Sequence, residues 1–291
     1  MNRNHIESIQ RVYPDLSIEE FYPNDIGQNN DVFMVNKSLV FRFPKYQKGI
    51  MCLRRETEIL NYIKNIVSIP IPKPIYQSFE EMEPQKVFTG YKLIDGVPMW
   101  RESLEGVKSV EVIKRLASQL VSFLLEIHSV SKETASKDLN LKISNPQEEM
   151  SILYDKIQTK LFPYISQEAQ KEITKSFNTF LNGEACTNIE ITLIHGDFGA
   201  SNILWNPDIR KVSGIIDFGG SYLGDPAYDF AGILSSYGKE FFDICMNLYP
   251  NGDQIRERVE FYKSTFALQE ALHGFENQDS QAFESGIKDY K

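Results

Sequence analysis

Long apolar runs and paired cysteines are both missing from this chain of 291 residues. No segment approaches the roughly 20 consecutive apolar residues that a membrane-spanning helix needs. The first residues, Met1 to His5, lack the apolar core of a secretory signal. The three cysteines, Cys52, Cys186 and Cys245, lie far apart without a C-x-x-C pair, which disfavours a zinc site or a disulfide framework. We therefore expect a protein of the reducing cytoplasm without a membrane partner.

A basic stretch is missing as well. The chain carries 31 Lys and Arg against 40 Asp and Glu, which gives a net charge of −9 and a pI near 5.1. Because the phosphates of a nucleic acid require a basic face, a nucleic-acid partner is disfavoured. An acidic chain suits a small cationic ligand, although acidity of this size is common among cytosolic proteins. We expect a monomer that acts on a small molecule.

Neither glycine-rich phosphate motif, G-x-x-x-x-G-K-[ST] or G-x-G-x-x-G, is present. A polar turn over residues 27–31 lies between the first two predicted strands, where its backbone and the side chains of Asn29 and Asn30 are candidates to cover nucleotide phosphates. An ordinary hairpin turn explains these residues equally well. Their assignment therefore depends on motifs further along the chain.

Two acidic motifs in the second half of the chain carry the strongest signal. Asp197 ends a His-Gly-Asp triplet and is followed five residues later by Asn202, and Asp217 opens an Asp-Phe-Gly triplet after an apolar strand at 212–216. This is the pattern of a kinase catalytic loop and its metal-binding aspartate. Phosphoryl transfer needs a base, hard oxygen ligands for Mg²⁺ and a positive group on the phosphates. The pattern predicts a kinase with Asp197 as general base and with Asn202 and Asp217 as Mg²⁺ ligands.

Periodicity divides the chain into a strand-rich first third and a helical remainder. The apolar alternation and turn residues predict strands, and longer stripes at helical spacing predict helices. Strands are expected at 18–22, 32–35, 39–43, 75–79 and 87–94, and helices at 50–66, 112–130, 147–161, 166–181, 226–234, 240–248 and 254–275.

Together with the Gly-Asp-Pro-Ala-Tyr-Asp segment at 224–229, the catalytic motifs resemble those of the aminoglycoside phosphotransferase family, which are small-molecule kinases. Over its whole length the chain is most similar to the 2''-phosphotransferases, type IVa. The resemblance implies an α+β, two-lobed protein-kinase-like fold. A small N-terminal antiparallel β lobe would bind the nucleotide (1–95), and a linker (96–108) would lead to a mostly helical C-terminal lobe with the catalytic loop and acceptor-binding helices (109–291).

The resemblance implies transfer of the γ-phosphate of ATP or GTP, with Mg²⁺, to a hydroxyl of a cationic aminoglycoside antibiotic, the 2'' hydroxyl, and hence resistance. Only seven residues separate Asp217 from Asp225, too few for the activation loop that protein kinases carry. A protein substrate is therefore disfavoured.

The positive group on the phosphates is predicted at Arg42, because the segment 39–43 resembles the strand that carries the phosphate-binding lysine in related enzymes. Lys45 is the alternative. Arginine makes bidentate phosphate contacts where lysine acts as a point charge. Glu56 is the expected acidic partner of Arg42, with Glu58 as second choice.

The segment from Tyr91 resembles the hinge strand that pairs with the edge of the purine base. The resemblance implies that the backbone of Lys92 and Ile94 binds the base and that Tyr91 limits the depth behind it. Leu204 and Ile216 would supply apolar faces for the ring.

An acceptor with several ammonium groups requires carboxylates beyond Asp197. The late predicted helices carry four acids and two aromatics that are candidates. These are Glu240, Asp243, Glu270 and Glu276, with Tyr237 and Phe275. For any single acid a solvated helix face is the favoured explanation, but at least two of the set are expected to contact the acceptor.

Three alternatives to an aminoglycoside kinase exist. A choline, homoserine or aminosugar kinase would carry the same catalytic motifs on the same scaffold. A pseudokinase that binds nucleotide as an interaction module is disfavoured, because Asp197, Asn202 and Asp217 are all intact. A metal-dependent hydrolase is disfavoured because no His-rich cluster supplies its ligands.

Overall fold

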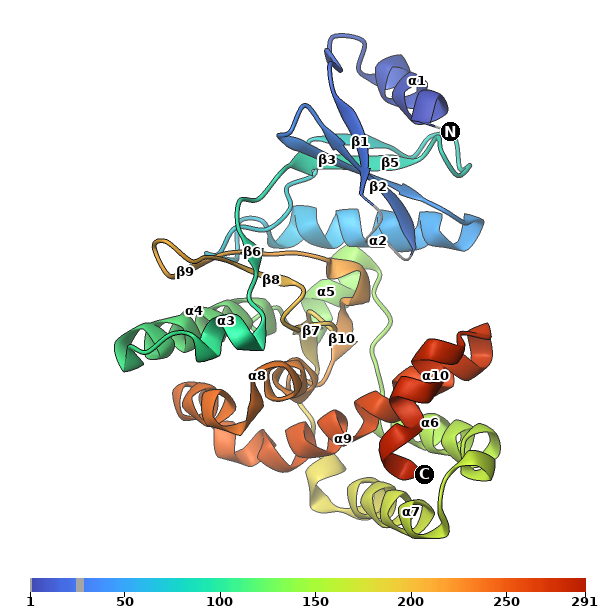
Figure 1. Ribbon diagram of the computed structural model, residues 1–291, viewed down its shortest axis with the longest axis vertical. Coiled ribbons are helices and arrows are strands. Elements are labelled where there is room, and N and C mark those ends of the chain that lie inside the picture. Colours follow the sequence, from blue (N-terminus) through green and yellow to red (C-terminus); the bar gives the residue numbers. More distant parts are fainter. Residues whose placement is uncertain (1, 25–28) are drawn as a thin grey trace. The chain divides into compact units, whose positions relative to one another are not determined.

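The computed structural model describes residues 2–24 and 29–291. The chain forms two compact units, one of Met1–Met99 with Ser201–Ser221 and one of Trp100–Ala200 with Tyr222–Lys291 (Figure 1). The segment that bears Asn202 and Asp217 thus belongs to the same unit as the N-terminal strands. Among the described residues, no helix is both long and apolar enough to cross a bilayer.

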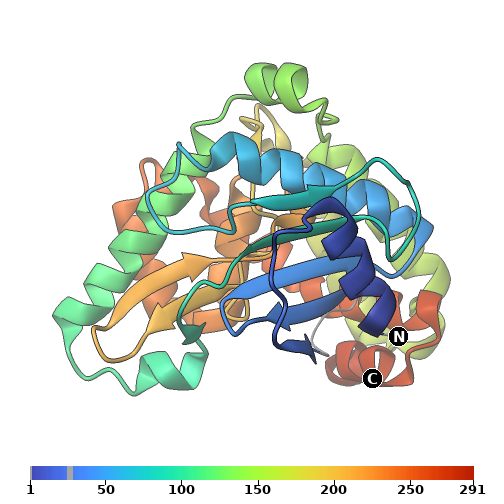
Figure 2. The ribbon, with the colours of Figure 1, turned by 90° about the horizontal axis from the view of Figure 1, so that it is seen from above.

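The first unit contains a five-stranded antiparallel sheet in the order β1-β2-β3-β5-β4. Helix α2 packs against β3 and β5 (Figure 2). A second antiparallel sheet has the order β6-β8-β9. The elements of this unit are α1 (Asn2–Val12), β1 (Phe21–Asn24), β2 (Asn30–Val35), β3 (Leu39–Pro44), α2 (Gln47–Ile63), β4 (Tyr76–Ser78), β5 (Phe88–Lys92), β6 (Val97–Pro98), β8 (Ile203–Asn206), β9 (Lys211–Ile215) and the 3₁₀ turn η3 (Phe218–Gly220).

An aromatic core fixes the register of the first sheet. Phe41 and Phe43 alternate with Arg42 along β3, so that both rings are buried against Phe88 on β5, at centroid distances of 5.8 and 5.4 Å. Gly90 lies opposite Phe41 across the β3–β5 pair, and a Cβ there would come within 2.6 Å of the Phe41 ring. The sheet therefore needs glycine at this position, and Arg42 is left on the face that α2 covers.

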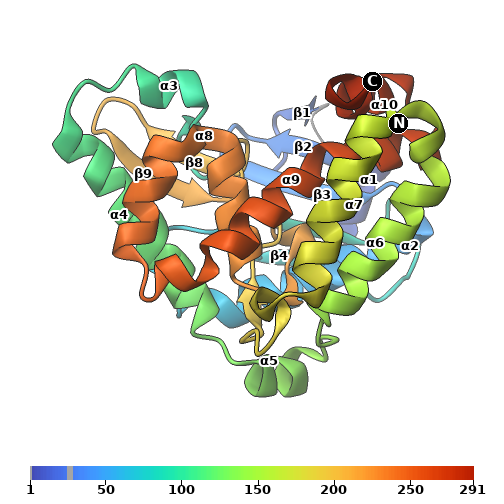
Figure 3. The same cartoon turned by 90° about the horizontal axis from the view of Figure 1, so that it is seen from below.

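The second unit is mostly helical and contains one pair of antiparallel strands, β7 with β10. Helices α6 and α7 lie side by side, and both contact α9 (Figure 3). Helix α8 packs against α4 and α9. The elements are α3 (Arg101–Glu105), α4 (Val110–His128), α5 (Lys132–Leu139), α6 (Pro146–Lys160), α7 (Gln167–Asn182), β7 (Thr192–Ile194), β10 (Tyr222–Gly224), α8 (Ala227–Leu248), α9 (Gly252–Asn277) and α10 (Ser280–Ile287).

Most of the predicted helices and strands form within a few residues of the expected bounds. Helix α2 begins at Gln47 and ends at Ile63, three residues earlier at each end than predicted. The two helices expected at 226–234 and 240–248 are one element, α8, interrupted at Gly238 by backbone angles of φ 78° and ψ −178°. Helix α1 was not predicted, although Ile9 within it is buried in the core of the first unit.

Candidate functional site

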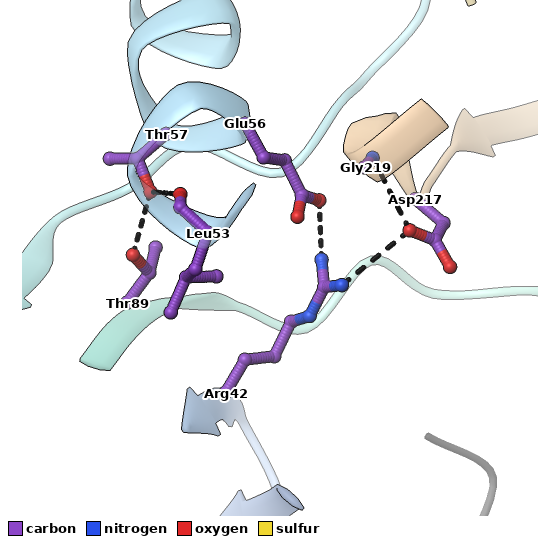
Figure 4. Close-up of polar contacts among 7 residues, drawn as sticks. All are labelled: Arg42, Leu53, Glu56, Thr57, Thr89, Asp217 and Gly219. Atoms are coloured by element: carbon purple, nitrogen blue, oxygen red, sulfur yellow. Dashed lines mark hydrogen bonds and ion pairs between the residues drawn. The ribbon is translucent and has the colours of Figure 1, made fainter. Parts of the chain in front are cut away.

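One cation and two carboxylates meet in the first unit (Figure 4). Arg42 on β3 forms an ion pair with Glu56 on α2, and its other guanidinium nitrogen lies 3.5 Å from Asp217 Oδ1. The side chains of Arg42 and Glu56 are 12% and 3% exposed, whereas that of Asp217 is 51% exposed. The cluster thus combines a buried ion pair, Arg42 with Glu56, and an exposed carboxylate, Asp217, that a ligand can reach.

A buried hydrogen bond joins α2 to β5 beside the pair of Arg42 and Glu56. Thr57 Oγ1 donates to the carbonyl of Leu53 at 2.7 Å and lies 2.7 Å from Thr89 Oγ1 on β5 (Figure 4). Thr89 is the residue opposite Arg42 in the β3–β5 register. The hydrogen bond between Thr57 and Thr89 therefore fixes α2 to β5 beside Arg42.

Replacing Thr57 with valine is expected to lower the free energy of unfolding by about 1 to 3 kcal/mol, because Thr89 Oγ1 would lose its partner inside the protein. Thr89 is only 2% exposed, so that water cannot replace the lost bond. Urea denaturation measures the change. The matched control is the double variant Thr57→Val/Thr89→Val, which should lie closer to wild type because no polar group is left unpaired. A double variant that is less stable than the single one would contradict this explanation.

Electrostatics keep Arg42 charged. Burial acts to lower the pKa of Arg42, but the adjacent Glu56, Tyr91 and Asp217 raise it, and the pKa lies above its ordinary value. Burial likewise raises the pKa of Glu56, and the charge of Arg42 acts against this. Burial raises the pKa of Tyr91 to about 12, with Arg42 acting in the opposite direction. The cluster therefore presents a permanent positive charge beside a neutral tyrosine.

Asp217 has an unusual backbone conformation. Its angles of φ 62° and ψ 73° lie in the left-handed region, which costs free energy for any residue other than glycine, although aspartate tolerates it better than most. Asp217 Oδ1 accepts a hydrogen bond from the Gly219 amide at 3.4 Å and thereby caps η3. Strained backbone of this kind concentrates at functional sites, because the surrounding structure must hold it in place.

Asn202 and Asp217 lie at adjacent strand ends. The carbonyl of Asn202 accepts a hydrogen bond from the amide of Ile216 at 2.9 Å, which places residue 202 beside the residue that precedes Asp217. Their side chains offer a carboxamide and a carboxylate oxygen, the hard donors that Mg²⁺ prefers. Within the described part of the chain, no group of three or more His, Cys, Asp or Glu side chains could hold a metal ion by itself. Two protein oxygens fit Mg²⁺, which commonly completes its coordination with water and substrate phosphates.

The other predicted nucleotide contacts also belong to the first unit. Leu204 is buried on β8. Ile94 packs against Gly214 on β9, where any side chain larger than that of glycine would collide with Ile94. Lys92 ends β5 and is exposed. Ile216 follows β9 and is half-buried. Ile94 therefore lies beside Gly214, which pairs with Leu204 across the second sheet.

The predicted phosphate turn is only partly described. Gly27 and Gln28 lie outside the described residues. Asn29 is exposed, and its carbonyl accepts a hydrogen bond from the Lys45 amide at 3.1 Å. Asn30 begins β2, and its side-chain oxygen is buried without a hydrogen-bond partner in the described structure. Both alternatives to the central pair, the Lys45 and Glu58 side chains, are exposed.

Asp197 belongs to the second unit, on a loop that follows β7. Asp229 on α8 is fully buried and accepts hydrogen bonds from the amides of His195 at 2.9 Å and Gly196 at 2.8 Å. The ring nitrogen Nδ1 of His195 in turn accepts from the Asp197 amide at 3.2 Å. Gly196 has a φ of 78°, which favours glycine over other residues. The loop is thus held by its backbone, and the Asp197 side chain is exposed.

A cavity of about 310 Å³ adjoins Asp197 in this unit. Its wall comes from the catalytic loop, from α8 and from α9, and the one carboxylate among these described lining residues is that of Asp197. The lining residues are Gly196, Asp197, Phe198, Gly199, Tyr228, Gly232, Ser235, Ser236, Phe266 and Gln269.

The candidate acceptor residues on the late helices do not line this cavity. Glu240 and Glu270 are exposed on α8 and α9, and the Phe275 ring lies 6.1 Å from that of Tyr164. Two further acids are paired with cations of the protein itself, namely Asp243 with Lys239 and Arg256, and Glu276 with Lys156 and Lys160.

Sequence reasoning missed the uncharged wall of the cavity. Tyr228, Gly232, Ser235 and Ser236 recur at helical spacing on one face of α8, just before the break at Gly238. This polar face on an otherwise apolar helix is the signal that the sequence offered. Gln269 on α9, 33 residues after Ser236 in the chain, had no local signal.

Comparison with known proteins gives a match over most of the chain. The profile of the phosphotransferase enzyme family matches residues 20–263. Viomycin phosphotransferase of Streptomyces vinaceus is 25% identical over 223 residues, which cover 76% of this chain and 75% of that protein.

Solved structures agree with this match. The complex of APH(2'')-IIIa with GDP and kanamycin is 26% identical, with a TM-score of 0.89 and coverage of 98% of this chain and 96% of that one. The GDP complex of wild-type aminoglycoside 2'-phosphotransferase-IIIa is also 26% identical, with a TM-score of 0.89 and coverage of 99% and 97%. The predicted kinase-like fold, with an antiparallel sheet in one part and mostly helices in the other, is confirmed.

Proposed function

The chain belongs to the phosphotransferase enzyme family, and on this basis we propose that it phosphorylates an antibiotic of the aminoglycoside or a related class. The donor is ATP or GTP, since both solved relatives described above are complexes with GDP. The preferred acceptor is an aminoglycoside, and the reacting group is its 2'' hydroxyl. Membership of the type IVa subgroup remains a prediction from overall sequence similarity.

The cluster of Arg42, Glu56 and Asp217 carries this proposal. A kinase that uses a nucleotide as phosphate donor needs a fixed cation for the phosphates and an accessible carboxylate for the metal. Arg42 is fixed by its buried partner Glu56, and Asp217 stays half-exposed beside it. The left-handed backbone of Asp217 is consistent with a functional role, because backbone strain is found often at functional sites.

Each polar residue then has a distinct role. Asp197 accepts the proton of the acceptor hydroxyl as that oxygen attacks the γ-phosphorus. Asn202 and Asp217 hold Mg²⁺, which when bound neutralises charge on the phosphates. Arg42 donates hydrogen bonds to phosphate oxygens, and Glu56 keeps its guanidinium in place. The chemistry needs no covalent intermediate on the protein.

The purine base and the phosphates of the nucleotide contact different residues. The backbone of Lys92 and Ile94 binds the edge of the base, and Tyr91 limits the depth behind it. Leu204 and Ile216 supply apolar faces. The backbone of Asn29 and the side chain of Asn30 add contacts to the phosphates. These seven residues all belong to the first unit.

For the acceptor, we assign the ammonium contacts to Glu240 and Glu270 and an apolar contact to Phe275. Glu270 lies one helical turn after Phe266, which lines the cavity, so that its side chain is on the neighbouring surface of α9. Neither glutamate is engaged in an ion pair among the described residues, in contrast to Asp243 and Glu276.

Neutralising Glu240 or Glu270 with glutamine is expected to raise the aminoglycoside KM by about 5 to 150-fold and to leave the nucleotide KM unchanged, because each variant loses a charge-assisted contact worth about 1 to 3 kcal/mol. The effect should weaken as salt rises, since exposed charges are screened over about 8 to 10 Å. Steady-state kinetics at several salt concentrations measure both changes.

The matched control is Glu257→Gln, another exposed acid of α9. It should not change the acceptor KM. Equal KM values for Glu240→Gln, Glu270→Gln and the control would show that these glutamates belong to an ordinary solvated face.

Viomycin is a second candidate acceptor, favoured by the similarity to viomycin phosphotransferase. The deciding experiment is a coupled assay of nucleotide consumption with ATP and with GTP. Kanamycin, viomycin, choline and homoserine serve as acceptors, and NMR of the product identifies the phosphorylated hydroxyl. Nucleotide consumption only with choline or homoserine would show a kinase of such small alcohols instead of an antibiotic kinase. No nucleotide consumption with any acceptor would favour a nucleotide-binding module.

A further inference from the structure

One face of α8 contacts the catalytic loop at both ends. Asp229 binds the amides of His195 and Gly196 at the start of the loop. Seven residues later on the same helix, Ser236 Oγ accepts a hydrogen bond from the amide of Ala200 at 3.0 Å. Positions separated by seven residues lie on the same face of a helix. The loop from 195 to 200 is therefore tied to one helix at each end.

Between these two sets of hydrogen bonds, the middle of the loop packs closely against α8. A Cβ on Gly232 would collide with the carbonyl oxygen of Phe198, so that glycine lets the loop lie directly on the α8 backbone. Within the loop, the amide of Gly199 donates to the carbonyl of Asp197 at 2.9 Å. Asp197 is thus part of a short turn whose ends cannot move independently of α8.

The two side chains that bind the loop, Asp229 and Ser236, differ in their own contacts. Asp229 is held from behind by His128, whose Nε2 lies 3.0 Å from Asp229 Oδ2, and the other ring nitrogen of His128 lies 3.2 Å from the Tyr249 hydroxyl. Ser236 is a neutral hydroxyl, and its helix is interrupted two residues later at Gly238. The neighbouring Ser235 and Ser236 itself also line the cavity that adjoins Asp197.

We propose that Ser236 is a positioning residue for phosphoryl transfer: by holding the Ala200 amide, it fixes the second end of the catalytic loop and keeps Asp197 in the wall of the cavity. This inference rests on the proposed function for its kinetic consequence. With Asp229 alone, the loop is held at one end, and the carboxylate of Asp197 can turn away from the acceptor hydroxyl. A displacement of about 1 Å at a reacting group lowers rates substantially.

The test compares Ser236→Ala with Ser236→Thr, which keeps the hydroxyl. In the alanine variant, we expect the Ala200 amide to exchange with deuterium about tenfold faster, because one hydrogen bond is lost. With kanamycin and GTP as substrates, kcat should fall about tenfold while the KM for GTP stays within about twofold. The threonine variant should restore both the exchange rate and kcat.

The control is Ser264→Ala, an exposed serine on α9 whose hydroxyl donates to the carbonyl of Phe261. It should change neither exchange in the loop nor kcat. An alanine variant of Ser236 with wild-type kcat would overturn the inference, and so would unchanged exchange at Ala200. A parallel fall in kcat, GTP affinity and melting temperature would show a general loss of structure and would also overturn it.

The proposed function can fail separately. If the wild-type protein phosphorylates neither kanamycin nor viomycin, the acceptor assignment is wrong. The exchange rate at Ala200 in the three variants then still decides whether Ser236 holds the loop.

Discussion

Asp197→Asn is expected to lower kcat by about 10² to 10⁴-fold and to leave the nucleotide KM nearly unchanged. A general base acts on the chemical step, and asparagine cannot accept the proton of the acceptor hydroxyl. The Asp197 side chain is exposed, and the backbone amide of this residue donates the hydrogen bond to His195 Nδ1 within the loop. The substitution should therefore leave folding intact. Steady-state kinetics and a thermal melt measure the two effects.

Asp208→Asn is a suitable control, because Asp208 is an exposed aspartate in the turn between β8 and β9. It should retain wild-type turnover. Turnover of Asp197→Asn within a few-fold of wild type would refute the assignment of Asp197 as general base.

Asp217→Ala is expected to abolish turnover and to remove the dependence of nucleotide affinity on Mg²⁺. The carboxylate of Asp217 is the charged oxygen donor of the proposed metal site, and Asn202 alone would leave the ion with one neutral protein ligand. Calorimetric titration of nucleotide with and without Mg²⁺ measures the effect directly.

A second variant separates charge from backbone conformation. Alanine at position 217 also disfavours the left-handed backbone and loses the cap on Gly219. Asp217→Asn removes the charge, but asparagine tolerates the same backbone angles and keeps an oxygen for the cap. Both variants should lose the effect of Mg²⁺. If Mg²⁺ still tightens nucleotide binding in the asparagine variant as in wild type, the metal ligands lie elsewhere.

The parts of the candidate site that are encoded locally could be predicted from sequence. Arg42 was predicted because segment 39–43 resembles the phosphate-binding strand of related enzymes, and Glu56 was predicted as its acidic partner on the helix that follows. The structure shows this pair. The roles of these residues in catalysis remain predictions.

The parts that depend on packing between distant segments could not be predicted. Gln269 and Ser236 line one cavity although no pattern in either helix refers to the other. The pairing of Glu276 with Lys156 and Lys160 joins α9 to α6 across more than a hundred residues. By contrast, Asp243 and Lys239 have the (i, i+4) spacing of helix ion pairs, a local signal that argued against Asp243 as an acceptor contact.

The first unit is discontinuous in sequence, because Ser201–Ser221 completes what Met1–Met99 begins. During synthesis, the strand β6 must wait for its partner β8, which is made about 100 residues later, or about 5 to 20 seconds at usual rates of translation. In that interval the nascent chain presents an unpaired strand edge, and Arg42 and Glu56 can pair before Asp217 exists. A ribosome that pauses between residues 99 and 201 would prolong the exposure of this edge to aggregation and to chaperones.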